Sequence, residues 1–387
     1  MKSKSLTILC CILLTGCSKS PETNPEILWD SYGVPHIYAD NYNDLFYAYG
    51  WSQMRNHGNL LLKLYGQARG QGAEYFGEKH LKSDQWVHTH NITQRSLDWW
   101  EKQDPDIRKM MTAFTDGIND YANENPDEID DLNQSILPAR PEDCFSHFQR
   151  VILFHFVTNP GIATFNPASI IKDRGSNTWA IGPSRSESGN AMLIANPHLP
   201  WFDMFTWFEA HTISHDLNAY GAGLVGMPFL GIAFNDYMGW SHTNNVHDGQ
   251  DLYELTLIDD GYQWGDGIQH FDERTVEIKV RNDDGNMTAS EFLIRESVHG
   301  PVVSEKDGKA YALRVVGLDQ PHVFRQYFDM ARAKTLKSFQ DAIRPLQNPY
   351  FTIMYADKDG HIMHVFGGRT PIRPAGDWNW LDVVPGV

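Results

Sequence analysis

The stretch RGSNTWAIG, residues 174–182, separates two parts of the chain that have different sequence patterns. Before it, the run ILWDSYGVPHIYAD, residues 27–40, predicts two strands joined by a turn. Apolar residues then recur at helical spacing over residues 41–66, 97–121 and 145–157. After it, short strand-like runs alternate with Gly, Asn and Asp turns, and two helices are expected near 322–333 and 335–345. A helical part followed by a strand-rich part predicts an α+β fold.

Length and charge exclude several classes of protein. With 387 residues, of which 41% are hydrophobic, the chain can bury a large core, as one large domain or two smaller ones. The formal net charge of −17 argues against nucleic-acid binding, because few cations are available to neutralise phosphates.

The first residues, MKSKSLTILCCILLTGC, predict a bacterial lipoprotein signal peptide over residues 1–16. Cys17 then becomes the lipidated first residue of an exported protein, anchored to a membrane and facing the periplasm or the cell exterior. A plain signal peptide or a short membrane anchor is the alternative, although the apolar run is too short to span a bilayer. Only Cys144 remains in the folded part, which leaves no intrachain disulfide and no thiolate metal cluster.

Familiar catalytic signatures are absent from the sequence: there is no Gly-x-Ser-x-Gly, no His-Glu-x-x-His and no phosphate-binding loop. The run DKDG, residues 357–360, begins like a calcium loop, but the pattern favours a hairpin turn. A serine in a Gly-Ser-Asn turn usually has no catalytic role when it stands alone. Its significance depends on the rest of the sequence.

Several ordered segments resemble the penicillin acylase family of N-terminal nucleophile hydrolases. They are DSYGVPHIYADNYNDLFYAYGWSQMRN, GQGAEYFG, GSNTWAIGPSRSESGNAMLIANPHLPW, FNDYMGWSHTNNVHDGQDLYEL and MYADKDGHIMHVFGGRTPIR. The resemblance implies a four-layer αββα sandwich. In it, a chain of residues 17–175 wraps a catalytic chain, residues 176–387, as an α/β heterodimer. It also implies that the catalytic chain is incomplete at its C-terminus.

The resemblance further implies self-cleavage between Gly175 and Ser176, which leaves Ser176 with both a hydroxyl and a free α-amine. An α-amine has a pKa of about 7.7 to 8.0, so near neutrality it can act as the base that activates the hydroxyl. The serine then needs no separate catalytic histidine or aspartate.

Other site residues are implied by their matching positions in the family. His198 would contact the nucleophile and order the site, and the backbone N–H of Asn244 would stabilise the oxyanion. The second oxyanion donor, an asparagine in the family, falls on Thr352, while Asn348 lies four residues earlier. Either Thr352 donates through its hydroxyl, or a local shift brings Asn348 in, or the site is impaired.

Arg373 and the calcium ligands are implied by the same match, whereas Leu199 and Trp201 are named because they stand beside His198. Arg373 would help to order the active site, with a surface ion pair as the alternative. Leu199 and Trp201 could line the acyl pocket, although apolar residues there are as easily core. Some family members bind structural calcium, and here Asp248, the Gln250 carbonyl and Asp251 match ligand positions, against the alternative of a solvated acidic turn.

The sequence therefore predicts an amidohydrolase that cleaves N-acyl compounds through an acyl-enzyme, without an organic cofactor. Candidate substrates are acyl-homoserine lactones, β-lactam side-chain amides and acylated peptides, and His198 slightly favours fatty-acyl groups. Two alternatives remain open at this point. One is a surface lipoprotein that kept the fold as a binding protein and lost catalysis, and the other is a hydrolase with an internal Ser/His/Asp triad.

Overall fold

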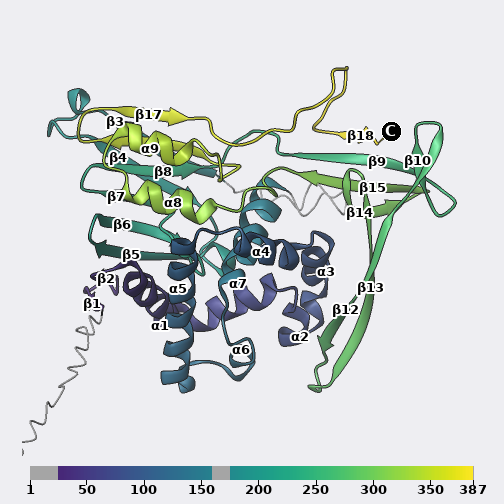
Figure 1. Ribbon diagram of the computed structural model, residues 1–387, viewed down its shortest axis with the longest axis horizontal. Helices are drawn as coiled ribbons and strands as arrows, with labels where there is room; N and C mark the ends of the chain where they lie inside the picture. The colour runs from purple at the N-terminus through teal and green to yellow at the C-terminus, as the bar shows by residue number, and fades with distance from the viewer. Residues whose placement is uncertain (1–24, 159–174, 387) are drawn as a thin grey trace, which may run out of the picture.

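The computed structural model of the protein describes residues 25–158 and 175–386 (Figure 1). Its N-terminal part is mainly helical. The helices there are α1 (Tyr42–Ala68), α2 (Gly72–Phe76), α3 (Leu81–Thr89), α4 (Ile92–Glu101), α5 (Pro105–Glu124), α6 (Asp131–Gln134) and α7 (Pro141–Phe148), followed by the π-helical turn η3 (Gln149–Val157). Short 3-10 turns are η1 (Glu78–His80), η2 (Pro126–Glu128), η6 (Pro183–Arg185) and η7 (Asp203–Phe205).

Two glycines let α1 and α5 pack with their backbones in close contact. A Cβ on Gly50 would lie 1.9 Å from the Phe114 carbonyl oxygen, and one on Gly117 would lie 2.0 Å from that of Tyr47. Real Cβ atoms do not approach backbone so closely, so larger residues at these positions would push the two helices apart. The pair forms much of the helical core of the N-terminal part.

The main sheet has eight strands in the order β1-β2-β5-β6-β7-β8-β16-β17. Only the β2–β5 pair is parallel. The strands are β1 (Glu26–Trp29), β2 (Pro35–Tyr38), β5 (Trp207–Ser214), β6 (Leu217–Leu224), β7 (Ile232–Asn235), β8 (Met238–Thr243), β16 (Thr352–Asp357) and β17 (Ile362–Val365). The first two strands therefore join the same sheet as strands from residues beyond 200, so the two parts of the chain share one core.

A second sheet extends away from the first (Figure 1). Its order is β11-β10-β9-β15-β14-β13-β12, with β18 beside β9. Its strands are β9 (Gln250–Ile258), β10 (Gly261–Trp264), β11 (Gly267–His270), β12 (Asp272–Arg281), β13 (Met287–Ser297), β14 (Gly300–Lys306), β15 (Lys309–Val315) and β18 (Val383–Pro385).

The third sheet is the hairpin of β3 (Gly175–Ile181) and β4 (Met192–His198), which begins in the stretch that separates the two sequence patterns. It stacks on one face of the eight-stranded sheet, and the helices α8 (Val323–Arg332) and α9 (Leu336–Ile343) cover the other face (Figure 1). Alternation along β8 shows this: Trp240 lies 6.0 Å from Phe339 of α9 between ring centroids, whereas Gly239 faces Leu193 of β4.

The α+β class is confirmed. Among the described residues the layers are helices, the eight-stranded sheet and the β3–β4 hairpin, so three of the four expected layers are represented. The hairpin turn expected at residues 357–360 joins β16 to β17, where Gly360 has a positive φ of 98°.

One expected helix is corrected. Residues 97–121 do not form a single helix, because α4 ends at Glu101 and α5 begins at Pro105. A proline disfavours helical backbone at the preceding residue, here Asp104, and is well accommodated as the first residue of a new helix.

The predicted signal peptide and Cys17 lie outside the described residues. Within residues 25–158 and 175–386, no helix combines the length and the apolar character needed to cross a membrane.

Candidate active site

Ser176 is the second residue of β3 and is half-buried. The register of the hairpin places it opposite Pro197, and Gly175 opposite His198. The Ser176 hydroxyl donates a hydrogen bond of 2.6 Å to the carbonyl oxygen of Gly175. The hydroxyl therefore touches the carbonyl group of the peptide bond at which cleavage is predicted.

Ser176 also lines an apolar cavity at the end of the eight-stranded sheet, which we call the acyl pocket. The pocket contains about 590 Å³ of space that is not filled by atoms, including its opening to solvent. Its lining comes from α7, the η3 turn, the hairpin, the eight-stranded sheet with its connecting segments, and α8. The residues are Phe148, Ile152, Phe156, Ser176, Pro197, Leu199, Trp207, Leu224, Met227, Phe229, Gly231, Ile232, His242, Asn244, Tyr327 and Phe351. An apolar lining of this kind suits an apolar small-molecule group.

The predicted site residues His198, Leu199 and Trp201, at the end of the hairpin, lie in three different environments. Leu199 lines the acyl pocket, whereas Trp201 is 97% exposed and is not part of its lining. His198 is exposed at the end of β4, beside Gly175 rather than within the pocket. The structure thus places His198 next to the predicted cleavage site and Leu199 next to the predicted acyl group.

The candidate oxyanion donors lie on adjacent strands. Asn244 follows β8 and lines the acyl pocket. Thr352 begins β16, opposite Thr243, and is buried. Asn348 is engaged elsewhere, because its amide nitrogen donates to the Tyr327 hydroxyl at 2.6 Å and its oxygen accepts from the Tyr350 backbone at 3.2 Å.

Alternation along β16 decides which face Thr352 occupies. Tyr355 packs on Phe339 of α9, with 4.8 Å between ring centroids, so odd-numbered side chains of this strand face the helices. Thr352 therefore faces the β3–β4 hairpin, which carries Ser176. Neither Thr352 nor Asn348 is among the residues that line the acyl pocket, and the second donor stays a prediction.

Arg373 binds the three residues that the sequence matched to calcium ligands. Its guanidinium donates to Asp251 Oδ1 at 2.9 Å, to Asp248 Oδ2 at 2.6 Å and to the Gln250 carbonyl at 3.4 Å. Asp251 is 2% exposed, so its charge needs a partner. The predicted role of Arg373 in ordering this region and the predicted calcium site thus involve the same oxygen atoms.

These residues do not form a complete calcium site. Calcium takes six to eight oxygen ligands, whereas here two carboxylates and one carbonyl already hold a guanidinium. Within residues 25–158 and 175–386, no group of three or more His, Cys, Asp or Glu side chains is placed to hold a metal ion. Calcium binding stays a prediction, and Arg373 is the cation that the structure provides.

His242 is the one titratable imidazole in the lining of the acyl pocket. Burial lowers its pKa to about 4, which the nearby Thr352 backbone carbonyl only partly offsets. The ring is therefore neutral near pH 7 and does not bring a positive charge into the pocket.

Much of the pocket lining could not be identified from the sequence. Phe148 and Ile152 lie in a helical segment, Tyr327 lies on α8, and Phe351 precedes β16. Each looks like an ordinary core residue in its own segment, and only the tertiary structure brings them to Ser176. No local sequence signal distinguishes them from other buried apolar residues.

The chain is similar in sequence to known proteins. The chain is 27% identical over 391 residues to acyl-homoserine lactone acylase PvdQ of Pseudomonas fluorescens, covering 89% of this chain and 50% of the relative. It is 25% identical over 430 residues to acyl-homoserine lactone acylase QuiP of Pseudomonas aeruginosa, covering 91% and 50%. The chain thus spans about half the length of these relatives.

Among solved structures, a thermostable penicillin G acylase from Alcaligenes faecalis matches 54% of this chain and 38% of its own, at 24% identity and a TM-score of 0.48. The family model for penicillin amidase matches residues 24–387, which is nearly the whole chain. On this match, the chain belongs to the penicillin amidase family.

Proposed function

We propose that this chain carries the catalytic serine of an acylase that hydrolyses the amide bond of N-acyl compounds. The observation that carries the proposal is the position of Ser176, which touches the Gly175 carbonyl and also lines the apolar acyl pocket together with Asn244. One serine is thereby within reach of both the peptide bond it would cleave and the substrate it would later attack.

The first step of the proposal is self-cleavage. The Ser176 hydroxyl attacks the Gly175 carbonyl carbon, the bond to the Ser176 nitrogen breaks, and water hydrolyses the resulting ester. The products are a chain that ends at Gly175 and a second chain that begins with Ser176. The new α-amine has a pKa of about 7.7 to 8.0 and is partly unprotonated near neutrality.

The second step is acyl transfer from substrate. The α-amine accepts the hydroxyl proton through a bridging water while Oγ attacks the substrate carbonyl, and the tetrahedral oxyanion receives hydrogen bonds from the Asn244 backbone N–H and the Thr352 hydroxyl. The amine leaves with a proton, and water then releases the carboxylic acid from Ser176. The apolar pocket favours acyl groups that are hydrocarbon chains or rings.

The substrate class follows from the pocket together with the relatives. PvdQ and QuiP are named as acyl-homoserine lactone acylases. The acyl pocket offers apolar contacts to the acyl group and few polar ones. We therefore propose N-acyl-homoserine lactones with a fatty acyl chain as the first substrates to test.

Two features of the proposal rest on the sequence. The lipid anchor at Cys17 would hold the exported enzyme at a membrane, and the two cleaved chains would remain together as a heterodimer. The shared core supports the latter, because β1 and β2 of the first chain pair within the same sheet as β5 of the second. A structural calcium ion would compete with Arg373 for Asp248 and Asp251.

The test is intact mass and N-terminal sequencing of purified protein beside the Ser176→Ala variant. We expect a fragment that begins Ser-Asn-Thr-Trp in the wild type and an uncut chain in the variant. The cleaved protein is then assayed for release of homoserine lactone from acyl-homoserine lactones. An uncut wild-type chain without amidase activity would contradict the proposal.

A further inference from the structure

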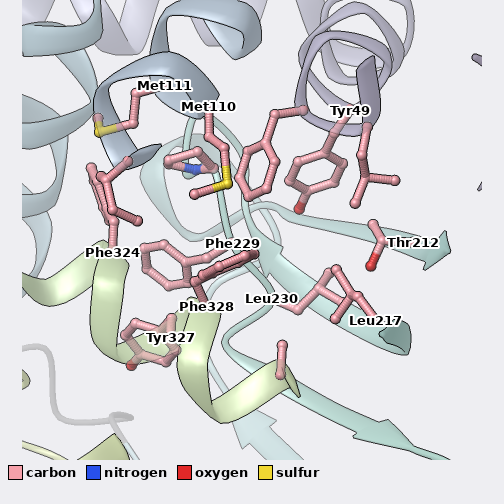
Figure 2. A pocket seen from close by; sticks show the side chains of 15 residues that line it. Tyr49, Met110, Met111, Thr212, Leu217, Phe229, Leu230, Phe324, Tyr327 and Phe328 are labelled. Carbon is pink, nitrogen blue, oxygen red and sulfur yellow. The ribbon is translucent and has the colours of Figure 1, made fainter. Parts of the chain in front are cut away.

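Figure 2 shows a second apolar cavity, which adjoins the acyl pocket because the two share lining residues. It contains about 560 Å³ of space not filled by atoms, including its opening to solvent, and it lies between helices α1, α5 and α8 and strands β5 and β6. Its lining is Leu45, Phe46, Tyr49, Ile107, Met110, Met111, Thr212, Leu217, Pro228, Phe229, Leu230, Phe324, Tyr327, Phe328 and Ala331. We call it the rear cavity.

Only two residues line both cavities, Phe229 and Tyr327. Their rings are stacked, with 4.1 Å between centroids and an interplanar angle of 8°. This is van der Waals contact, so no hydrocarbon chain can pass between the two rings as they stand. The stacked pair is therefore a wall between the acyl pocket and the rear cavity.

The two halves of the wall are held differently. Tyr327 is 4% exposed on α8, and its hydroxyl accepts the hydrogen bond from Asn348. Phe229 is half-buried in the segment between β6 and β7. Its ring packs against the rings of Tyr327 and Phe324. Phe229 is the half that can be removed without leaving a buried polar group unpaired.

The rear cavity has the chemistry of a hydrocarbon site. Met110 and Met111 of α5 and the aromatic residues of α8 face the same space (Figure 2). Methionine side chains are flexible and polarisable, so they adapt to irregular apolar groups. The few hydroxyls include that of Thr212, which already donates to the Ala219 carbonyl.

We propose that the Phe229–Tyr327 pair sets the longest acyl chain this enzyme accepts, and that the rear cavity is the space into which longer chains extend once the wall opens. The inference rests on the proposed acylase function. Phe229 is then a specificity-determining residue. The rear cavity would hold the distal methylene groups of a long fatty acyl chain.

The test compares wild type with Phe229→Ala on N-acyl-homoserine lactones whose straight acyl chains have roughly 4 to 16 carbons. The series is meant to include chains that end within the acyl pocket and chains that are too long for it. In the wild type, kcat/KM rises with chain length and then falls where the chain meets the wall. In Phe229→Ala the maximum moves to longer chains, and each further methylene gains about fourfold, the value expected for its burial.

A matched control is Leu217→Val, which alters a side chain on β6 that lines only the rear cavity and is not one of the rings packed on Phe229. It should retain the wild-type length profile. Met111→Ala enlarges the rear cavity and should change the profile only when combined with Phe229→Ala. If Phe229→Ala folds poorly, Phe229→Leu should move the kcat/KM maximum in the same direction, towards longer acyl chains, but by a smaller amount.

A binding series separates this inference from the acylase proposal. Isothermal titration calorimetry with straight-chain fatty acids measures affinity against chain length without any catalytic step. If Phe229→Ala binds longer fatty acids than the wild type does, the result supports the wall, whether or not any amide is hydrolysed. A lack of amide hydrolysis would count against the proposed acylase function but not against the wall. Identical length profiles for the wild type and Phe229→Ala, or an equal shift in Leu217→Val, would overturn the proposed role of the wall.

Discussion

His198 and Gly175 face each other across the β3–β4 ladder, and a Cβ on Gly175 would lie 3.5 Å from His198 Nδ1. The imidazole is thus next to the peptide bond that precedes Ser176. His198 is exposed and lies outside the lining of the acyl pocket, so its placement favours a role in processing more than in holding the acyl group.

We therefore predict that His198→Ala slows self-cleavage. Loss of a positioned proton-transfer group typically costs about 10²-fold or more, and we expect a decrease of that order in the cleavage rate. The measurement is the time course of the two fragments on a denaturing gel. Asn196→Ala is the control, because Asn196 lies on the same face of β4, two residues away, opposite Asn177. Equal rates for both variants would argue against a role for His198.

Thr352 is predicted to supply the second oxyanion hydrogen bond. Thr352→Val keeps the shape of the side chain and removes its hydroxyl, so kcat should fall about 10² to 10³-fold while KM changes little. Thr352→Ser should retain most of the activity. Ser241→Ala, on the same face of the neighbouring strand β8, should have little effect. A Thr352→Val enzyme with wild-type kcat would point to a different donor.

Arg373 is predicted to stabilise the region around Asp248 and Asp251. Arg373→Gln leaves the buried Asp251 carboxylate without its cation, which should lower the free energy of unfolding by about 3 kcal/mol. Arg369→Gln is the matched control, because Arg369 pairs at 3.5 Å with the exposed Asp319 and should cost less than about 1 kcal/mol.

The Arg373→Gln variant also tests calcium binding. Millimolar calcium should raise the melting temperature of Arg373→Gln more than that of the wild type, because only the variant leaves the carboxylates free for another cation. Differential scanning fluorimetry with calcium and with a chelator measures this. A large calcium effect on the wild type would show that the ion binds without displacing Arg373.

Three buried histidines predict a loss of stability in mild acid. Burial lowers the pKa of His90 and of His147 to about 3 and that of His242 to about 4. As the pH falls below about 6.5, the unfolded chain takes up protons that the folded chain does not. Stability is therefore retained above that pH and is lost as the pH falls from about 6.5 towards 4.

Each of these histidines contributes up to about 1.4 kcal/mol per pH unit to that slope. Denaturant unfolding between pH 7 and 4.5 measures it. His90→Phe should reduce the slope by up to about 1.4 kcal/mol per pH unit, since the ring stacks on Phe154 and a phenyl ring can take its place. A flat profile in this range would show that these imidazoles reach solvent or a proton acceptor.

The sequence by itself determined the order and type of most elements, because hydrophobic periodicity and turn residues are local properties. The change from helices to strands near Ser176 and the pairing of residues 27–40 as two strands are examples, and both are found in the structure. The segment motifs also predicted the family. The break between α4 and α5 was missed, although Pro105 marks it.

Only the tertiary structure decided what surrounds Ser176. Phe148, Tyr327 and Phe351 are far apart in the chain and have no local signature, since an apolar residue that lines a pocket reads like one that fills a core. The stacked Phe229 and Tyr327, and the guanidinium of Arg373 on Asp248 and Asp251, are likewise products of packing between distant segments. Local sequence specifies backbone conformation, whereas cavities and ion pairs depend on which distant side chains the fold brings together.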